Sequence, residues 1–128
     1  MAPRLRIDVV GCRPASGEPG RWHVAWLVHN DEPVALELHN AWIPHGRFRG
    51  AGRLPLAAVI ESGGSARLEF SVAASEAPGS TVQNAFLILQ VSAGASAWRI
   101  FARMRVEFDA QAVPRPIVEV VTTSESLQ

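Results

Sequence analysis

Alternation of apolar and polar residues is the main pattern along the chain, and it predicts short β-strands throughout. Side chains of a strand point to opposite faces in turn, so a half-buried strand has a hydrophobic period of two. No segment shows a convincing helical period. Runs that are apolar at every second position, or β-prone throughout, lie at residues 5–9, 22–28, 36–42, 56–60, 66–72, 85–91, 98–108 and 117–121.

The breaks between these runs are rich in residues that end strands. Gly11–Gly20 and Pro44–Arg53 each contain several glycines and at least one proline, and both are predicted to be loops. Seven to eight short strands separated by such turns predict an all-β antiparallel sandwich over residues 1–110. Residues 111–128 are expected to form a C-terminal extension, with a short β-prone run at Ile117–Val121 and a polar tail.

The stretch from Trp22 to Trp42 leaves two arrangements open. Paired as a hairpin, the strands at 22–28 and 36–42 place Trp22 opposite Trp42; in two different sheets, their apolar faces meet in the core. Alternation alone does not separate these cases. In both, strict alternation puts the even positions of the second strand on one apolar face: Leu36, Leu38, Asn40 and Trp42.

Two turn motifs are similar to those of bacterial immunoglobulin-like domains. The segment 28–33, Val-His-Asn-Asp-Glu-Pro, resembles their strand–Asn–turn–Pro pattern, and Glu61-Ser62-Gly63-Gly64-Ser65 resembles their Gly-centred hairpin before an alternating strand. The resemblance implies an immunoglobulin-like sandwich with a role in adhesion, assembly or carriage. The Cys…Trp…Cys framework of antibody domains is absent, because the chain has a single cysteine.

Composition narrows the class of partner. A chain of 128 residues with a formal net charge of zero forms one domain without global attraction to nucleic acid or to a membrane surface. All twelve basic residues are arginine. Arginine suits anion recognition, but a GC-rich genome gives the same bias. The single thiol, Cys12, suits a reducing compartment, and no signal or membrane-spanning segment is apparent, so we expect a cytoplasmic protein.

The best local candidate for a binding surface is the loop from Trp42 to Arg53. Guanidinium groups bind carboxylates or phosphates, aromatic rings supply contact area, and glycines let a ligand approach the backbone. Alternatively, the aromatic residues fill the core and the arginines pair with nearby carboxylates. The candidate residues are Trp42, His45, Arg47, Phe48, Arg49 and Arg53.

A second candidate surface lies on the outward positions of the strand at 98–108. Three arginines with a phenylalanine between them form a basic-aromatic row, which Arg67 joins if it lies on a neighbouring strand. Charged outward faces also protect sheets from edge pairing, so the row has a structural explanation as well. Its members are Arg99, Phe101, Arg103 and Arg105.

Catalytic and metal-binding patterns are weak. The four histidines match no metal-binding spacing, although His23 and His39 become diagonal neighbours if their strands form a hairpin. No nucleophile elbow and no phosphate-binding glycine loop is present. We therefore expect no enzyme activity, no cofactor and no metal.

These observations favour a non-catalytic module for protein interaction or assembly. The expected partner is an acidic protein or a second copy of the chain. The run Ile117–Val121 is either the last strand of the sandwich or a strand that adds to a partner's sheet. The alternative function is binding of an anion or small ligand through the loop 42–53, with nucleic acid as a special case that steep salt dependence identifies.

Overall fold

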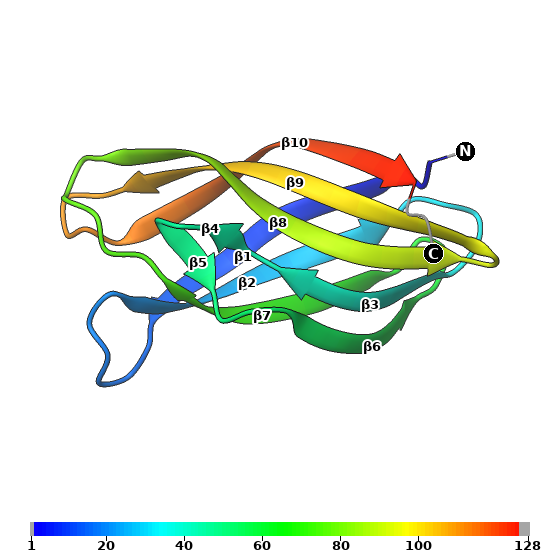
Figure 1. Ribbon diagram of the computed structural model, residues 1–128, viewed down its shortest axis with the longest axis horizontal. Coiled ribbons are helices and arrows are strands. Elements are labelled where there is room, and N and C mark those ends of the chain that lie inside the picture. The colour runs from blue at the N-terminus through cyan, green and yellow to red at the C-terminus, as the bar shows by residue number, and fades with distance from the viewer. Residues whose placement is uncertain (1, 126–128) are drawn as a thin grey trace.

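The computed structural model describes residues 2–125 and shows an all-β protein with two antiparallel five-stranded sheets arranged as a sandwich. The long strands run along the length of the molecule in two layers (Figure 1). In the described part of the chain, no helix is long and apolar enough to cross a membrane. Because the regular structure of the described residues consists of the strands of these two sheets, the all-β prediction is confirmed.

Sheet A brings together strands that are distant in the chain. Its strand order is β1-β2-β7-β5-β4, and all neighbouring pairs are antiparallel. The strands are β1 (Leu5–Pro14), β2 (Arg21–Asn30), β4 (Pro44–His45), β5 (Phe48–Gly50) and β7 (Ser65–Ala73).

Sheet B contains the C-terminal strands and has the order β10-β9-β8-β3-β6, again antiparallel. The strand β8, which is apolar on both faces in sequence, lies at its centre. The strands are β3 (Leu36–Trp42), β6 (Leu54–Ile60), β8 (Thr81–Ala93), β9 (Ser96–Phe108) and β10 (Pro114–Glu125).

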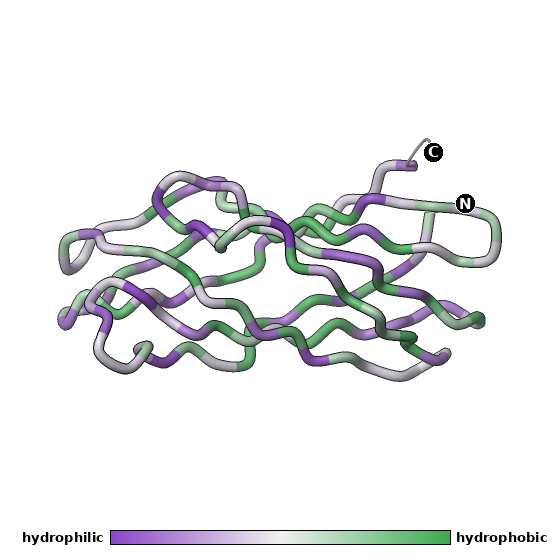
Figure 2. Tube along the Cα trace, turned by 60° about the horizontal axis from the view of Figure 1, so that its bottom comes forward, coloured by the Kyte–Doolittle hydropathy of each residue, from purple (hydrophilic) through white to green (hydrophobic). Residues whose placement is uncertain are grey.

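The core lies between the two sheets, and the alternation along each strand places its side chains there. Green and purple segments alternate along the strands in Figure 2, as expected for sheets with one buried face. Trp26 of β2 is fully buried, and its ring meets that of Phe70 edge to face, with 5.6 Å between centroids. Such aromatic pairs add about 0.5–1.5 kcal/mol beyond the area that they bury.

A β-bulge in β3 interrupts the alternation that the sequence suggests. Leu38 pairs with Val91 of β8, but Asn40 pairs with Gln90, the residue next to Val91. His39 is therefore an extra residue in β3 relative to β8. Because side chains alternate with a period of two, one extra residue reverses the faces of every position beyond it.

The bulge moves Trp42 from the core face to the outer face of sheet B. Ala41 and Ile43 are at most 1% exposed and point into the core, while Trp42 between them is only half-buried. The expectation that Asn40 and Trp42 share the inward face of Leu36 and Leu38 was wrong. No composition signal marks the bulge, since His39 is an ordinary strand residue.

The chain passes from sheet B to sheet A directly after Trp42. β3 belongs to sheet B and the next strand, β4, to sheet A, so the segment crosses the side of the sandwich at Ile43. β4 and β5 form a small hairpin within 44–50, where the sequence predicted only loop. These two strands explain why the structure has ten strands rather than seven to eight. Of the two arrangements for β2 and β3, the structure has the one in different sheets.

Asn30 joins the end of β2 to the turn between β6 and β7. Its side chain is fully buried, and Nδ2 donates hydrogen bonds to the carbonyls of Val34 and Ile60, each at 2.9 Å. Its Oδ1 accepts the N–H of Glu32 at 2.8 Å. This one amide therefore fixes the turn after β2 in sheet A to the end of β6 in sheet B.

Residues expected in a C-terminal extension are part of sheet B. β10 pairs with β9 from Pro114, opposite Phe108, to Glu125, opposite Trp98. The run Ile117–Val121 thus lies in the last strand of its own sheet, and Thr122–Glu125 of the expected polar tail continue that strand. Residues 126–128 lie outside the described part of the chain.

Each of the three long edge strands contains an irregularity that discourages pairing with another chain. β1 has a register shift between Val9 and Gly11, β10 has one between Val118 and Val120, and β6 has one in its pairing with β3. Bulges twist an edge away from flat pairing. Prolines at 55, 114 and 116 remove further backbone donors from β6 and β10.

Candidate functional site on the outer face of sheet B

An aromatic cluster crosses the outer face of sheet B. Trp42 of β3 lies opposite Ile88 of β8, which lies opposite Phe101 of β9, so the three share one level of the sheet. Phe86, two residues before Ile88, packs edge to face on Phe101 with 6.4 Å between ring centroids. We call Trp42, Phe86, Ile88 and Phe101 the aromatic cluster.

Two guanidinium groups lie against the indole of Trp42. The Cζ atom of Arg53 is 4.0 Å from the ring centroid, and that of Arg99 is 5.8 Å away. Arg53 directly precedes β6 on one side of β3, whereas Arg99 belongs to β9 on the other side, so they approach the ring from opposite directions along the sheet. Cation–π attraction holds the planar groups near the ring and leaves their N–H donors available to an anion.

Arg53 and Arg99 differ from most arginines of the protein in having no carboxylate partner in the described chain. Eight of the twelve form an ion pair with a carboxylate. Among residues 2–125, the arginines without a carboxylate partner are Arg47, Arg49, Arg53 and Arg99. Three of these four come from the loop that the sequence singled out, and the fourth begins the predicted basic-aromatic row.

The structure divides the predicted loop surface between the two sheets. Trp42 and Arg53 lie together on sheet B, while Arg49 is an exposed residue of β5 in sheet A. Phe48 is fully buried, so it fills the core and cannot act as the exposed anchor that we expected.

His45 is the last residue of β4, and Arg47 lies in the hairpin turn between β4 and β5. Nδ1 of His45 accepts the backbone N–H of Arg47 at 3.0 Å. The imidazole therefore fixes the local turn, while the guanidinium of Arg47 extends from it without a carboxylate partner in the described chain.

The predicted row on β9 is also divided. Nη1 of Arg105 lies 2.8 Å from Glu119, and the Nε atom of Arg103 lies 3.9 Å from the same carboxylate. Hydrogen bonds from Arg115 and Arg105 lower the pKa of Glu107. These residues form an ion-pair network across β9 and β10, so only Arg99 and Phe101 of the row join the candidate site.

The histidines are not brought together. His23 lies in sheet A and His39 in sheet B, and no group of three or more metal-ligating side chains occurs among the described residues. Ser65, His29 and Asp8 lie in a row across three neighbouring strands of sheet A: Ser65 Oγ is hydrogen-bonded to His29 Nδ1 at 2.8 Å, and His29 Nε2 is 3.3 Å from an Asp8 carboxylate oxygen. The row lies on an outward sheet face, and none of the main hollows of the described chain adjoins it.

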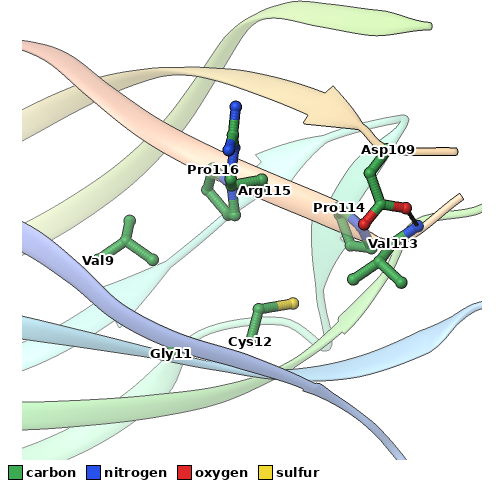
Figure 3. A pocket seen from close by; sticks show the side chains of 8 residues that line it. All are labelled: Val9, Gly11, Cys12, Asp109, Val113, Pro114, Arg115 and Pro116. Atoms are coloured by element: carbon green, nitrogen blue, oxygen red, sulfur yellow. Dashed lines mark hydrogen bonds between the residues drawn. The ribbon is translucent and has the colours of Figure 1, made fainter. Parts of the chain in front are cut away.

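Cys12 lines a hollow of about 370 Å³ at the seam between β1 and the start of β10. Figure 3 shows Cys12 on the β1 side, facing Asp109 and the segment Val113–Pro116. Burial raises the pKa of the thiol to about 11. The thiol is therefore protonated at neutral pH and is a poor nucleophile.

Two members of the candidate site were not identified from the sequence, although a signal for them exists. Phe86 and Ile88 make the run at 85–91 apolar on both faces, which is typical of a central or well-covered strand. β8 is central, but within residues 2–125 no further layer of secondary structure covers its outer face, and the two residues pack against Trp42 and Phe101 instead.

The outer face of sheet B thus combines apolar contact area with two available cations. The chain matches no protein-family model, and no curated protein matches it in sequence.

Proposed function

We propose that this protein is a non-catalytic, immunoglobulin-like binding domain of the cytoplasm, whose outer sheet B face binds an acidic segment of a partner protein. The observation that carries the proposal is the position of two guanidiniums, those of Arg53 and Arg99, against Trp42. Tryptophan and arginine are the residues that most often dominate interface energetics. The half-buried thiol of Cys12 supports the proposed compartment.

Charge complementarity supports an acidic partner. Arg103, Arg105 and Arg115 pair with carboxylates of β9 and β10, whereas Arg53 and Arg99 lie next to apolar side chains without a carboxylate partner in the described chain. A segment with carboxylates and an apolar residue satisfies both features, because the carboxylates accept the guanidinium N–H donors while the apolar residue covers the half-buried rings of Phe86 and Phe101. The register shifts in the edge strands β1, β6 and β10 discourage pairing with a strand of a partner, which favours a sheet face as the interface.

Selection of binders from a displayed peptide library tests the proposal directly. At low salt the protein should enrich peptides that combine Asp or Glu with aromatic or aliphatic residues. In ¹H–¹⁵N spectra, addition of such a peptide should shift the indole N–H signal of Trp42. The indoles of Trp22, which donates to the Ala74 carbonyl, and of the fully buried Trp26 should stay in place. Enrichment without acidic residues, or shifts confined to other surfaces, would overturn the proposal.

The alternative, binding of an anion or small ligand, gains support from a different part of the structure. Arg49, which the sequence assigned to the loop surface, lies on sheet A and lines one hollow together with Arg21, from which it is separated by β7.

A further inference from the structure

A hollow of about 280 Å³ opens on the outer face of sheet A between two arginines. Arg21 of β2 and Arg49 of β5 both pair with Ala73 of β7, one from each side. Residues directly opposite one another in an antiparallel sheet share a face, so both arginine side chains leave the sheet on the same face as the small side chain of Ala73. Gly50 and Ala51 complete the lining of the hollow.

The distance between the backbones of Arg21 and Arg49 is short enough for their side chains to meet. They are separated by one intervening strand, which places their backbones about 10 Å apart, twice the spacing of neighbouring strands. Ala73 has only a methyl group between them. Two long guanidinium side chains can therefore converge over Ala73 from opposite sides, while the small residue leaves room for a ligand.

The charges around the hollow are not balanced within the described chain. Arg21 contacts Glu18 at 2.8 Å and Ser71 Oγ at 3.3 Å, but Arg49 has no carboxylate partner there. Like charges close together on one sheet face are destabilising unless an anion lies between them. Glu18 is an exposed residue in the connection between β1 and β2, so its carboxylate neutralises only one of the two cations.

From this geometry we infer that the hollow between Arg21 and Arg49 is a binding site for the phosphate group of a phosphate monoester. A dianion balances two guanidiniums, and a tetrahedral group presents oxygens to donors that approach from two sides. The site is separate from the aromatic cluster, which lies on the other sheet. Its ligand is either free phosphate-bearing small molecules or a phosphorylated side chain, which offer the same group.

Titration with two probes, inorganic phosphate and a phosphoserine peptide of neutral sequence, tests the inference. Isothermal calorimetry gives the affinities, and the ¹⁵N amide signals of Ala73 and Gly50 report the location. Tighter binding of the peptide identifies a protein-borne phosphate, whereas equal or tighter binding of inorganic phosphate identifies a small molecule. Absence of shifts at Ala73 and Gly50 with both probes would overturn the inference.

Four variants separate a built site from diffuse charge. Arg49→Gln should weaken phosphate binding about tenfold, the scale of one lost charge-assisted hydrogen bond. Arg47→Gln removes a guanidinium that does not line the hollow, and it should change affinity less than about twofold. Ala73→Leu keeps both charges but fills the hollow, so it should abolish binding.

Glu18→Gln is the most discriminating variant, because it should strengthen phosphate binding whereas Arg49→Gln and Ala73→Leu should weaken it. Removal of the competing carboxylate beside Arg21 should strengthen phosphate binding about threefold. An equal effect of Arg47→Gln and Arg49→Gln, or weaker binding by the Glu18 variant, would show that no specific site exists. Neither outcome depends on the acidic partner proposed for sheet B.

Discussion

The guanidinium carbon of Arg53 lies 4.0 Å from the centre of the Trp42 indole ring, on the outer face of sheet B. This contact depends on the bulge at His39, which turns Trp42 outward. It also depends on the return of the chain from sheet A to sheet B just before β6. A local irregularity in one strand and the order of the strands thus create the binding face together.

A double-mutant cycle should detect this contact as a coupling energy. Arg53→Gln and Trp42→Ala should couple by about 0.5–1 kcal/mol in urea unfolding, the scale of an exposed cation–π interaction. Arg99→Gln and Trp42→Ala should couple less, because Arg99 is 5.8 Å from the ring. Additive losses in both cycles would show that the arginines do not interact with the indole in solution.

Asn30 should be among the most sensitive polar positions for stability. Asn30→Ala leaves the buried carbonyl of Ile60 and the N–H of Glu32 without their partner, so unfolding free energy should fall by about 2–4 kcal/mol. Asn84→Gly is the control, because Asn84 is exposed with a φ of 58°, a conformation that glycine adopts easily. The Asn84→Gly substitution should change the free energy of unfolding only slightly. Comparable losses in the two variants would contradict the role of the Asn30 amide.

Acid should weaken the fold through the ion pairs near the turn after β2. The Arg6 side chain donates two hydrogen bonds to Asp31, which lower the pKa of that carboxyl. A carboxyl with a lowered folded-state pKa stabilises the protein above its unfolded pKa, and the contribution disappears as pH falls through the folded value. Arg6→Gln should therefore be less stable than the native protein at pH 7.

That difference should shrink as pH falls below about 4, where Asp31 of the unfolded chain takes up a proton. It should disappear at the lower pH at which Asp31 of the native protein is protonated as well. Urea midpoints between pH 7 and pH 2.5 measure it. Arg47→Gln serves as the control and should show no such convergence, because Arg47 has no carboxylate partner in the described chain. A constant gap between Arg6→Gln and the native protein over the whole range would contradict this explanation.

Removal of residues 117–128 should unfold the protein rather than free it from an assembly. The deletion removes most of β10, which pairs along β9 and forms one edge of sheet B. Circular dichroism should show loss of the cooperative unfolding transition. A truncated chain that unfolds cooperatively and forms a smaller oligomer than the full chain would instead assign β10 to an intermolecular contact.

Alternation and turn residues were sufficient to predict an all-β sandwich and most of its strands, because each strand buries one face. They were insufficient at positions where the backbone departs from regularity. The extra residue His39 reverses the side of Trp42, and a glycine-rich segment forms the short strands β4 and β5. Bulges and sheet crossings depend on tertiary packing, which a single sequence does not encode as a local pattern.

The candidate site shows the same limit. The loop and the β9 row were identified separately, and only the structure brings Arg53 and Arg99 to one indole. In the structure Phe48 lies in the core, and Arg103 and Arg105 pair with Glu119. Which arginines remain without a carboxylate is decided by strand order, and strand order was not accessible from the sequence.

The most direct test of the proposed binding face compares two double variants. Arg53→Gln/Arg99→Gln and Arg47→Gln/Arg49→Gln each remove two guanidiniums, so they are matched in charge and disrupt no ion pair within residues 2–125. The measurement is the affinity of each for a selected acidic peptide. We predict a loss of about tenfold or more for the first and less than about twofold for the second. Equal losses, or a loss only in the second, would contradict the assignment of the interface to Trp42.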